Sequence, residues 1–168
     1  MLVGLISDTH IPQAAKYMPP QVKEAFKNVD LILHAGDIYQ LSVLDELEQI
    51  APVLAARGNG DTKLPPDPRI KESQVLTLDG MSLGMTHSVE YPEPPWCTIE
   101  KAMEREFGGP VEIIVSGDTH VAIVESYKGI LIINPGSPTL PNGMYQLGTV
   151  GLLEISAGRV EARIIQLR

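Results

Sequence analysis

Acidic, histidine and amide side chains gather at five places in this sequence, each directly after a short apolar run. The five segments are Ser7-Asp8-Thr9-His10, His34-Ala35-Gly36-Asp37, Arg57-Gly58-Asn59-Gly60-Asp61, Thr86-His87 and Ser116-Gly117-Asp118-Thr119-His120. They contain all four histidines of the chain. Because ligands of open α/β sheets bind just beyond the carboxyl ends of the strands, we expect these segments to meet at one site.

The residue types in these segments are suited to metal binding. The seven candidate ligands are Asp8, His10, Asp37, Asn59, His87, Asp118 and His120. Carboxylate, imidazole and amide together favour Mn²⁺, Zn²⁺ or Fe²⁺ over the all-oxygen sites of Mg²⁺ and Ca²⁺. Seven ligands exceed the needs of one tetrahedral ion, so two ions sharing a bridging carboxylate are expected. Such a pair can hold a hydroxide and clamp both oxygens of an in-line displacement at phosphorus.

The apolar pattern predicts the elements that position these residues. Expected strands cover 2–6, 31–33, 52–56, 74–78, 81–86, 112–115, 121–126, 130–133, 149–155 and 160–167, and expected helices cover 20–29, 41–50 and 96–107. Asp79-Gly80 is a hairpin turn signal between two of the strands. A βαβαβ first half and a hairpin-rich second half predict two mixed sheets with helices outside.

Composition limits the kinds of protein that this chain can be. With 168 residues, 43% of them hydrophobic and 20% charged, a single folded domain over residues 1–168 is expected and disorder is excluded. The formal charge of −8 argues against a nucleic-acid partner, so a phosphate substrate would depend on metal ions for positive charge. The single cysteine, Cys97, and the lack of a long apolar run predict a cytoplasmic protein without a membrane partner. A homo-oligomer is compatible with the sequence.

The order of these motifs resembles that of the calcineurin-like metallophosphoesterases. The matching motifs are Asp8-x-His10, Gly36-Asp37, Gly58-Asn59, Thr86-His87 and Gly117-Asp118-Thr119-His120. Three longer stretches are similar to the small single-domain YfcE-type phosphodiesterases, a branch that also includes a retromer subunit. They are Ile6-Ser7-Asp8-Thr9-His10-Ile11-Pro12, Leu33-His34-Ala35-Gly36-Asp37 and Asn134-Pro135-Gly136-Ser137.

This resemblance implies a fold, a set of ligands and an activity. The implied fold is a four-layer αββα sandwich of two mixed sheets flanked by helices. Asp8, His10, Asp37 and His120 would hold the first ion, Asp37 would bridge, and Asn59, His87 and Asp118 would complete the second site. Asn59 and His87 are also expected to contact the substrate. The implied activity is hydrolysis of a small phosphoester, a diester in preference to a monoester. Mn²⁺ is the expected metal, with Zn²⁺, Fe²⁺ or Ni²⁺ as alternatives.

The sequence departs from the family pattern at three positions. Asp118 stands where the family has a histidine, Ser88-Val89 stands where a Gly-His is common, and Gly60 replaces a catalytic histidine of larger relatives. An aspartate at 118 makes the centre one charge less positive than a histidine would. We therefore expect a firm first metal site and a weaker or more selective second one.

Several residues and the activity itself allow more than one interpretation. Asp61 is either a turn residue or a catalytic proton-handling group, and His34 is expected to support the ligands rather than bind metal. Trp96 and Met103 are expected in the core, and Asn134-Pro135-Gly136-Ser137 is most simply a turn. The alternative to an enzyme is a protein-interaction scaffold of the same fold with a degenerate metal site.

Overall fold

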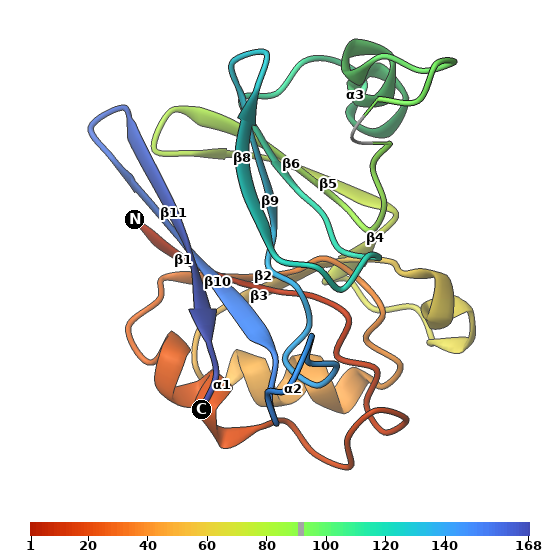
Figure 1. Cartoon of the computed structure of the whole chain (residues 1–168), viewed down its shortest axis with the longest axis vertical. Helices are drawn as coiled ribbons and strands as arrows, with labels where there is room; N and C mark the ends of the chain where they lie inside the picture. Colours follow the sequence, from red (N-terminus) through yellow and green to blue (C-terminus); the bar gives the residue numbers. More distant parts are fainter. Residues whose placement is uncertain (91–92) are drawn as a thin grey trace.

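Two β-sheets packed face to face make up the centre of the molecule (Figure 1). The structure is a computed structural model that describes residues 1–90 and 93–168. The first sheet contains, in spatial order, β11 (Arg159–Gln166), β10 (Thr149–Ser156), β1 (Leu2–Ile6), β2 (Leu31–His34), β3 (Val53–Ala56) and β4 (Ile70–Lys71). The second contains β5 (Ser73–Leu78), β6 (Met81–Thr86), β7 (Ile113–Val115), β9 (Ile130–Asn134) and β8 (Ile123–Tyr127).

Parallel strands lie at the centre of both sheets. β1, β2 and β3 run parallel, with Ile6 beside His34 and His34 beside Ala55. In the second sheet β6, β7 and β9 run parallel, with Met85 beside Val115 and Val115 beside Ile133. Their carboxyl ends therefore meet at a common edge of each sheet, where the polar segments begin.

Helices cover the outer face of each sheet (Figure 1). α1 (Pro20–Phe26) and α2 (Leu41–Glu48) pack Phe26 and Leu44 into a core cluster with the outer face of the first sheet. α3 (Ile99–Phe107) packs Met103 against the second sheet, and Leu5 and Leu83 lie between the sheets. The resulting order of helix, sheet, sheet and helix confirms the predicted αββα sandwich. No helix among the described residues is long and apolar enough to span a membrane.

The third helix starts later than predicted. α3 begins at Ile99 because Thr98 caps it, its hydroxyl accepting a hydrogen bond from the Lys101 N–H. Trp96 therefore lies before the helix and is 75% exposed, so its predicted core position is wrong, whereas Met103 is buried as expected. The 3₁₀ helix η1 (Asn59–Lys63) and the two-residue strand β4 had no periodic signal, since η1 contains no apolar side chain and β4 is too short to show an alternation.

Candidate metal centre

The five polar segments converge from both sheets onto one site. Asp8 and His10 follow β1, Asp37 follows β2, and Asn59 opens η1 after β3. His87 follows β6, while Asp118 and His120 follow β7. The structure brings these segments together, and the distances given below show which of the predicted side chains lie close to one another.

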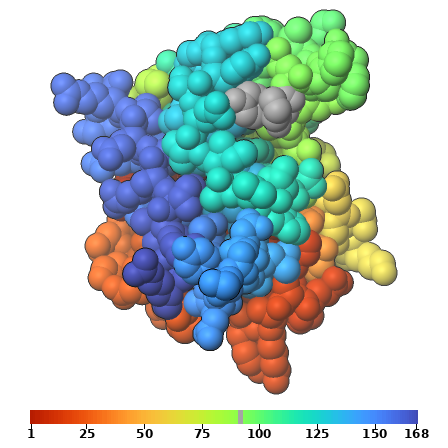
Figure 2. Space-filling model, in the orientation of Figure 1, coloured from red at the N-terminus to blue at the C-terminus, as the bar shows by residue number. Residues whose placement is uncertain are grey.

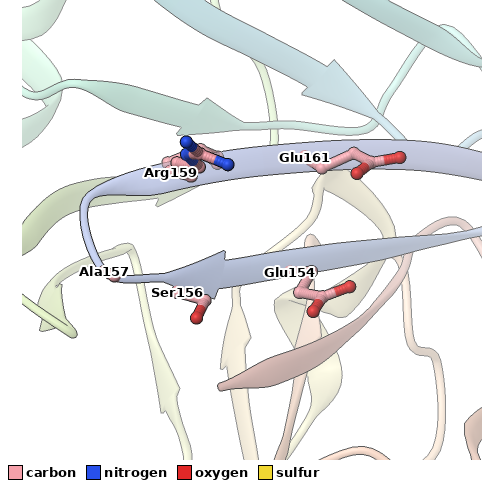
Figure 3. A pocket seen from close by; sticks show the side chains of 6 residues that line it. Glu154, Ser156, Ala157, Arg159 and Glu161 are labelled. Carbon is pink, nitrogen blue, oxygen red and sulfur yellow. The ribbon is translucent and has the colours of Figure 1, made fainter.

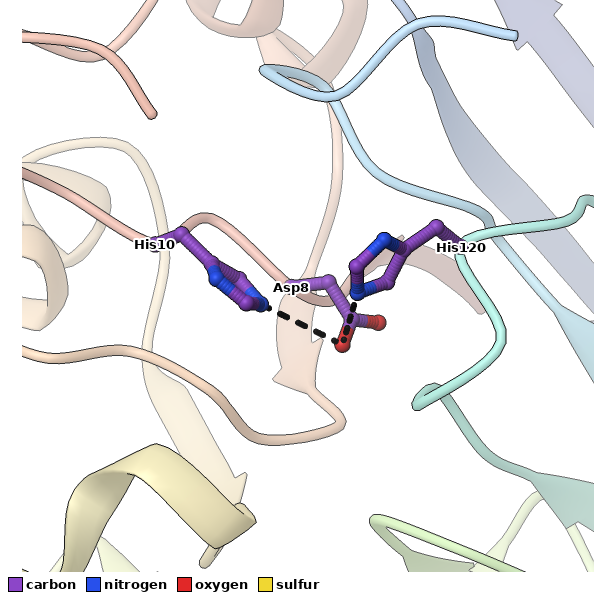
Figure 4. Close-up of side chains that lie close together, drawn as sticks. All are labelled: Asp8, His10 and His120. Atoms are coloured by element: carbon purple, nitrogen blue, oxygen red, sulfur yellow. Dashed lines mark ion pairs between the residues drawn. The ribbon is translucent and has the colours of Figure 1, made fainter. Parts of the chain in front are cut away.

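One group of possible metal ligands consists of Asp8, His10 and His120 (Figure 4). Both histidines direct Nε2 at the same carboxylate oxygen, Asp8 Oδ1, at 3.8 Å from His10 and 3.5 Å from His120. The rings approach edge to face, with centroids 5.1 Å apart. Two imidazole nitrogens and a carboxylate oxygen facing a common point are a suitable donor set for a divalent transition metal.

A second group consists of Asp8, Asp37 and His87, all of them buried. Asp37 faces both groups, because its Oδ2 lies 3.1 Å from His10 Nε2 and its Oδ1 lies 3.6 Å from His87 Nε2. Asp8 belongs to both groups. The two groups are thus joined by two carboxylates.

The histidine nitrogens that face these carboxylates are free to donate a lone pair to a metal ion. His87 Nδ1 lies 2.7 Å from the Ala35 carbonyl oxygen, which only accepts, so Nδ1 carries the proton and Nε2 keeps its lone pair. Nε2 of His87 and Nε2 of His10 are buried without a hydrogen-bond partner. A buried polar atom without a partner is costly, and coordination of a cation would remove that cost.

Burial of Asp8 also favours a cation at this place. Burial raises the pKa of the Asp8 carboxyl, and the nearby Asp37 carboxylate adds to the effect, which together outweigh the opposing influence of the Ser7 hydroxyl and the His87 and His120 imidazoles. A bound divalent cation would stabilise the ionised carboxylate and reverse this preference. The donor set, the unpartnered nitrogens and this carboxylate together fit a metal centre.

The backbone at the site adopts an unusual conformation. Nine described residues other than glycine have positive φ, and five of them are predicted ligands: Asp8, His10, Asp37, Asp118 and His120. Such conformations cost free energy and persist where the surrounding structure enforces them. Three of the other four, Asp79, Lys128 and Ala157, precede glycines in hairpin turns. Backbone strain in this molecule is therefore concentrated at the predicted ligands.

Two glycines allow the ligand segments to approach each other. A Cβ atom on Gly58 would lie 2.1 Å from the Asp37 backbone nitrogen, and one on Gly117 would lie 2.6 Å from Asp8 Oδ2. No side chain can be accommodated at such distances without moving the ligand. These glycines hold open the space in which Asp8 and Asp37 sit.

The remaining two predicted ligands lie at the rim of the site. Asp118 Oδ1 lies 3.7 Å from His87 Nε2 and accepts a hydrogen bond of 3.4 Å from Asn59 Nδ2. The Ser88 hydroxyl donates to Asp118 Oδ2 at 3.1 Å, so two positions that depart from the family pattern contact each other. Asp118 lies outside both ligand groups and its side chain is 41% exposed. Metal binding by Asn59 and Asp118, as by the other predicted ligands, stays a prediction.

Asp61 organises the backbone beneath the ligands. Its fully buried carboxylate accepts hydrogen bonds from four backbone N–H groups at 2.8–3.0 Å. The donors are Asp37, Ile38, Tyr39 and Gly58. Both oxygens of Asp61 are thus engaged by backbone donors, as a turn-forming residue would be. The proton-handling role stays a prediction.

Sequence reasoning missed three residues that support the site. The Ser137 hydroxyl donates to the Asp8 carbonyl oxygen at 2.7 Å, and Asn134 Nδ2 donates to the Gly117 carbonyl oxygen at 2.7 Å. The stretch interpreted as a turn therefore also holds two ligand segments, and its similarity to the family was the only signal. The Tyr39 ring lies 4.6 Å from the His10 ring, centroid to centroid, and no motif pointed to it.

His34 is the histidine that no ligand group includes. Its Nδ1 accepts from the Gly36 N–H at 3.2 Å and its Nε2 lies 3.1 Å from the Thr9 hydroxyl, so both ring nitrogens are engaged. Complete burial lowers the pKa of His34 to about 4. The folded protein therefore holds this imidazole in its neutral form.

We expect the His34 pKa to make folding stability depend on pH. Because the folded-state pKa lies below the unfolded value of 6.5, the unfolded chain binds the proton first. The stabilisation is complete above pH 6.5 and is lost as the pH falls toward 4, about 2 kcal/mol of it by pH 5. Urea unfolding of chelator-treated protein at pH 7 and pH 5 should show this loss in the wild type and a smaller one in His34→Gln. Equal losses in both proteins would contradict the assignment.

A wide hollow of about 810 Å³ lies elsewhere, at the free end of the β10–β11 hairpin (Figure 3). It is lined by Glu154, Arg159 and Glu161 among others. Glu154 pairs with Leu2 at the start of β1, whereas the ligands follow the end of that strand. The hollow therefore lies at the opposite end of the strands from the metal centre.

Comparison with known proteins shows the family to which the chain belongs. The model of the calcineurin-like phosphoesterase superfamily domain matches residues 1–158. A protein of Methanothermobacter thermautotrophicus named as a probable metallophosphoesterase is 35% identical over 167 residues, which are 99% of this chain and 92% of that protein. A phosphodiesterase of Methanocaldococcus jannaschii is 26% identical over 151 residues, covering 81% of this chain and 83% of that one.

Solved structures share the arrangement of the whole chain. The crystal structure of Vps29 from Chaetomium thermophilum superposes with a TM-score of 0.80 at 21% identity, covering 100% of this chain and 86% of that one. At this identity the similarity describes the fold alone.

Proposed function

Because the chain belongs to the calcineurin-like phosphoesterase superfamily, we propose that it is a phosphodiesterase that uses two divalent metal ions. The observation that carries this proposal is the pair of ligand groups joined through Asp8 and Asp37. Mn²⁺ is the proposed metal, with Zn²⁺, Fe²⁺ or Ni²⁺ as alternatives, because a donor set of carboxylate, imidazole and amide suits transition metals of this kind. Divalent ions bound there would supply an activated water nucleophile and neutralise the charge developing on the phosphoryl oxygens.

The residues of the chain would prepare this site for the reaction. Asp8 and Asp37 provide the negative charge that attracts the cations, and the Ala35 carbonyl oxygen fixes the ring of His87 through its Nδ1 proton. Asn59 lies at the rim, where its amide donates to Asp118, and we propose that this amide also donates a hydrogen bond to a phosphoryl oxygen of the substrate.

The charge of the site supports a diester as substrate. The described side chains that form the centre include three aspartates, Asp8, Asp37 and Asp118, and neither lysine nor arginine. With two divalent ions bound and these three aspartates ionised, the centre would carry a net charge of only about +1, which matches the single negative charge of a diester better than the roughly two negative charges of a monoester at neutral pH. The phosphodiesterase among the relatives points to the same substrate class.

The test is turnover of bis(p-nitrophenyl) phosphate and p-nitrophenyl phosphate by Mn²⁺-loaded protein. We expect hydrolysis that a chelator abolishes and Mn²⁺ restores, with the diester cleaved faster than the monoester. A faster monoester reaction would refute the diester preference. No turnover of either compound by metal-loaded protein would favour the alternative function, a protein-interaction scaffold with a degenerate metal site.

The two metal sites are expected to differ in affinity because Asp118 lies at the rim and outside both ligand groups. Calorimetric titration of metal-free protein with Mn²⁺ should show a tight step followed by a weaker one. Asp118→His should tighten the weaker step by about tenfold or more, the scale on which changes around a ligand alter metal affinity.

Asp30→His is the control for this titration, because Asp30 is exposed and hydrogen-bonds only the start of β1. It should leave both steps unchanged. Two equally tight steps in the wild-type protein would refute the expected asymmetry.

A further inference from the structure

A groove of about 240 Å³ opens directly beside the metal centre. His120 forms part of its wall, together with Val121 and Ala122 from the segment after β7. The opposite wall comes from the loop between β9 and β10, through Leu140 and Tyr145. In Figure 2 the atoms of these two segments lie next to each other on the visible face.

The groove is uncharged, in contrast to the centre that it adjoins. Its lining contains no aspartate, glutamate, lysine or arginine. Val121, Ala122, Leu140 and the Tyr145 ring contribute apolar surface. A group bound here would therefore be selected by shape and apolar contact rather than by charge.

Four of the side-chain donors that border the groove are already engaged. Ser137 Oγ donates to the Asp8 carbonyl, Thr149 Oγ1 to the Pro135 carbonyl, and Asn142 Nδ2 to the His120 carbonyl. Gln166 Nε2 donates to the carbonyl oxygens of Leu147 and Gly148. A substituent with a polar edge would compete poorly for these donors, because each would have to give up a bond that it already makes.

We propose that this groove binds an uncharged, apolar ring of the phosphoester substrate while its phosphoryl group lies at the metal centre. A dry apolar cavity of about 150 Å³ holds one benzene molecule, so the groove has room for a single ring. His120 belongs to both the groove and a ligand group, which places the ring and the phosphoryl group side by side. The inference rests on the proposed function and adds the class of substrate, an aryl phosphoester.

The contribution of the ring to binding can be measured by comparing two ligands that share the same charged group and differ in having a ring or a methyl group. The monomethyl esters of phenylphosphonic and methylphosphonic acid, called phenylphosphonate and methylphosphonate below, each carry one negative charge as a diester does. They are titrated into Mn²⁺-loaded protein and their dissociation constants are measured by calorimetry. The wild type should bind phenylphosphonate about tenfold more tightly, because burying a ring removes apolar surface from water. This measurement does not depend on turnover.

Two variants test whether the preference comes from the groove. Tyr145→Ala removes one wall, and because Tyr145 is 58% exposed the fold should tolerate the change. Ala122→Trp fills the groove from the other wall. Each should reduce the preference for phenylphosphonate to about twofold or less while leaving methylphosphonate binding unchanged. The control Met144→Ala alters a neighbouring, fully exposed side chain outside the groove and should keep the tenfold preference.

The outcomes distinguish this inference from its premise. If the wild type binds both phosphonates equally, or if Tyr145→Ala and Ala122→Trp keep the full preference, the inference is overturned and the proposed function stands. If the metal-loaded wild type binds neither phosphonate, the phosphoester site itself is refuted and the inference falls with it.

Discussion

Asp37→Asn is expected to reduce phosphodiester turnover by at least about a thousandfold. Asp37 faces a histidine of each ligand group, with Oδ2 3.1 Å from His10 Nε2 and Oδ1 3.6 Å from His87 Nε2. Replacing one oxygen by an amide nitrogen removes both the charge and a ligand atom between the groups. Loss of several kcal/mol of metal-dependent stabilisation corresponds to about three factors of ten in rate.

The measurement pairs turnover with metal content. Asp37→Asn should retain fewer ions than the wild type by elemental analysis, and without metal its unfolding temperature should be no lower, since a negative charge has been removed from a crowded site. Asp45→Asn is the control, because Asp45 is exposed on α2, pairs with Arg69 and should leave turnover unchanged. A metal-depleted Asp37→Asn protein that keeps most of its turnover would disprove the proposed role of the metal ions.

Asp61→Ala is expected to lower the free energy of unfolding by about 4 kcal/mol or more. Four backbone N–H groups would lose their acceptor, and three of these four hydrogen bonds are buried. Each buried donor left without a partner costs about 1–3 kcal/mol. Because two of these donors belong to Asp37 and Gly58, the metal-binding segments should loosen with the loss of stability.

Asp30 provides a control that shows how much stability is lost when an aspartate with a single backbone hydrogen bond is replaced. Asp30 also accepts from a backbone N–H, that of Leu2 at 2.7 Å, but this bond is exposed to solvent. Asp30→Ala should therefore cost only about 1 kcal/mol in the same urea titration. If Asp61→Ala proved as stable as Asp30→Ala while losing turnover and altering the pH profile, Asp61 would be a proton-handling residue rather than a structural one.

The sequence alone determined the order of the elements and the place of the site. Strands buried on both faces carry continuous apolar runs, and the polar residues that follow them mark the carboxyl ends of parallel strands. Both signals are local, so the sequence alone predicts the convergence of Asp8, His10, Asp37, His87 and His120. η1, which has no apolar side chain, and β4, which has only two residues, left no such signal.

Only the tertiary structure decided how these residues are held. Three features depend on segments that lie far apart in the chain. Asp8 belongs to both ligand groups, Asp61 accepts hydrogen bonds from four backbone donors, and Ser88 contacts Asp118. The exposure of Trp96 was decided in the same way, by a helix that starts at the Thr98 cap. Local patterns fix which residues reach the edge of a sheet, whereas distances between side chains depend on how loops from different strands pack against one another. Those distances are therefore a property of the folded molecule and not of any one segment.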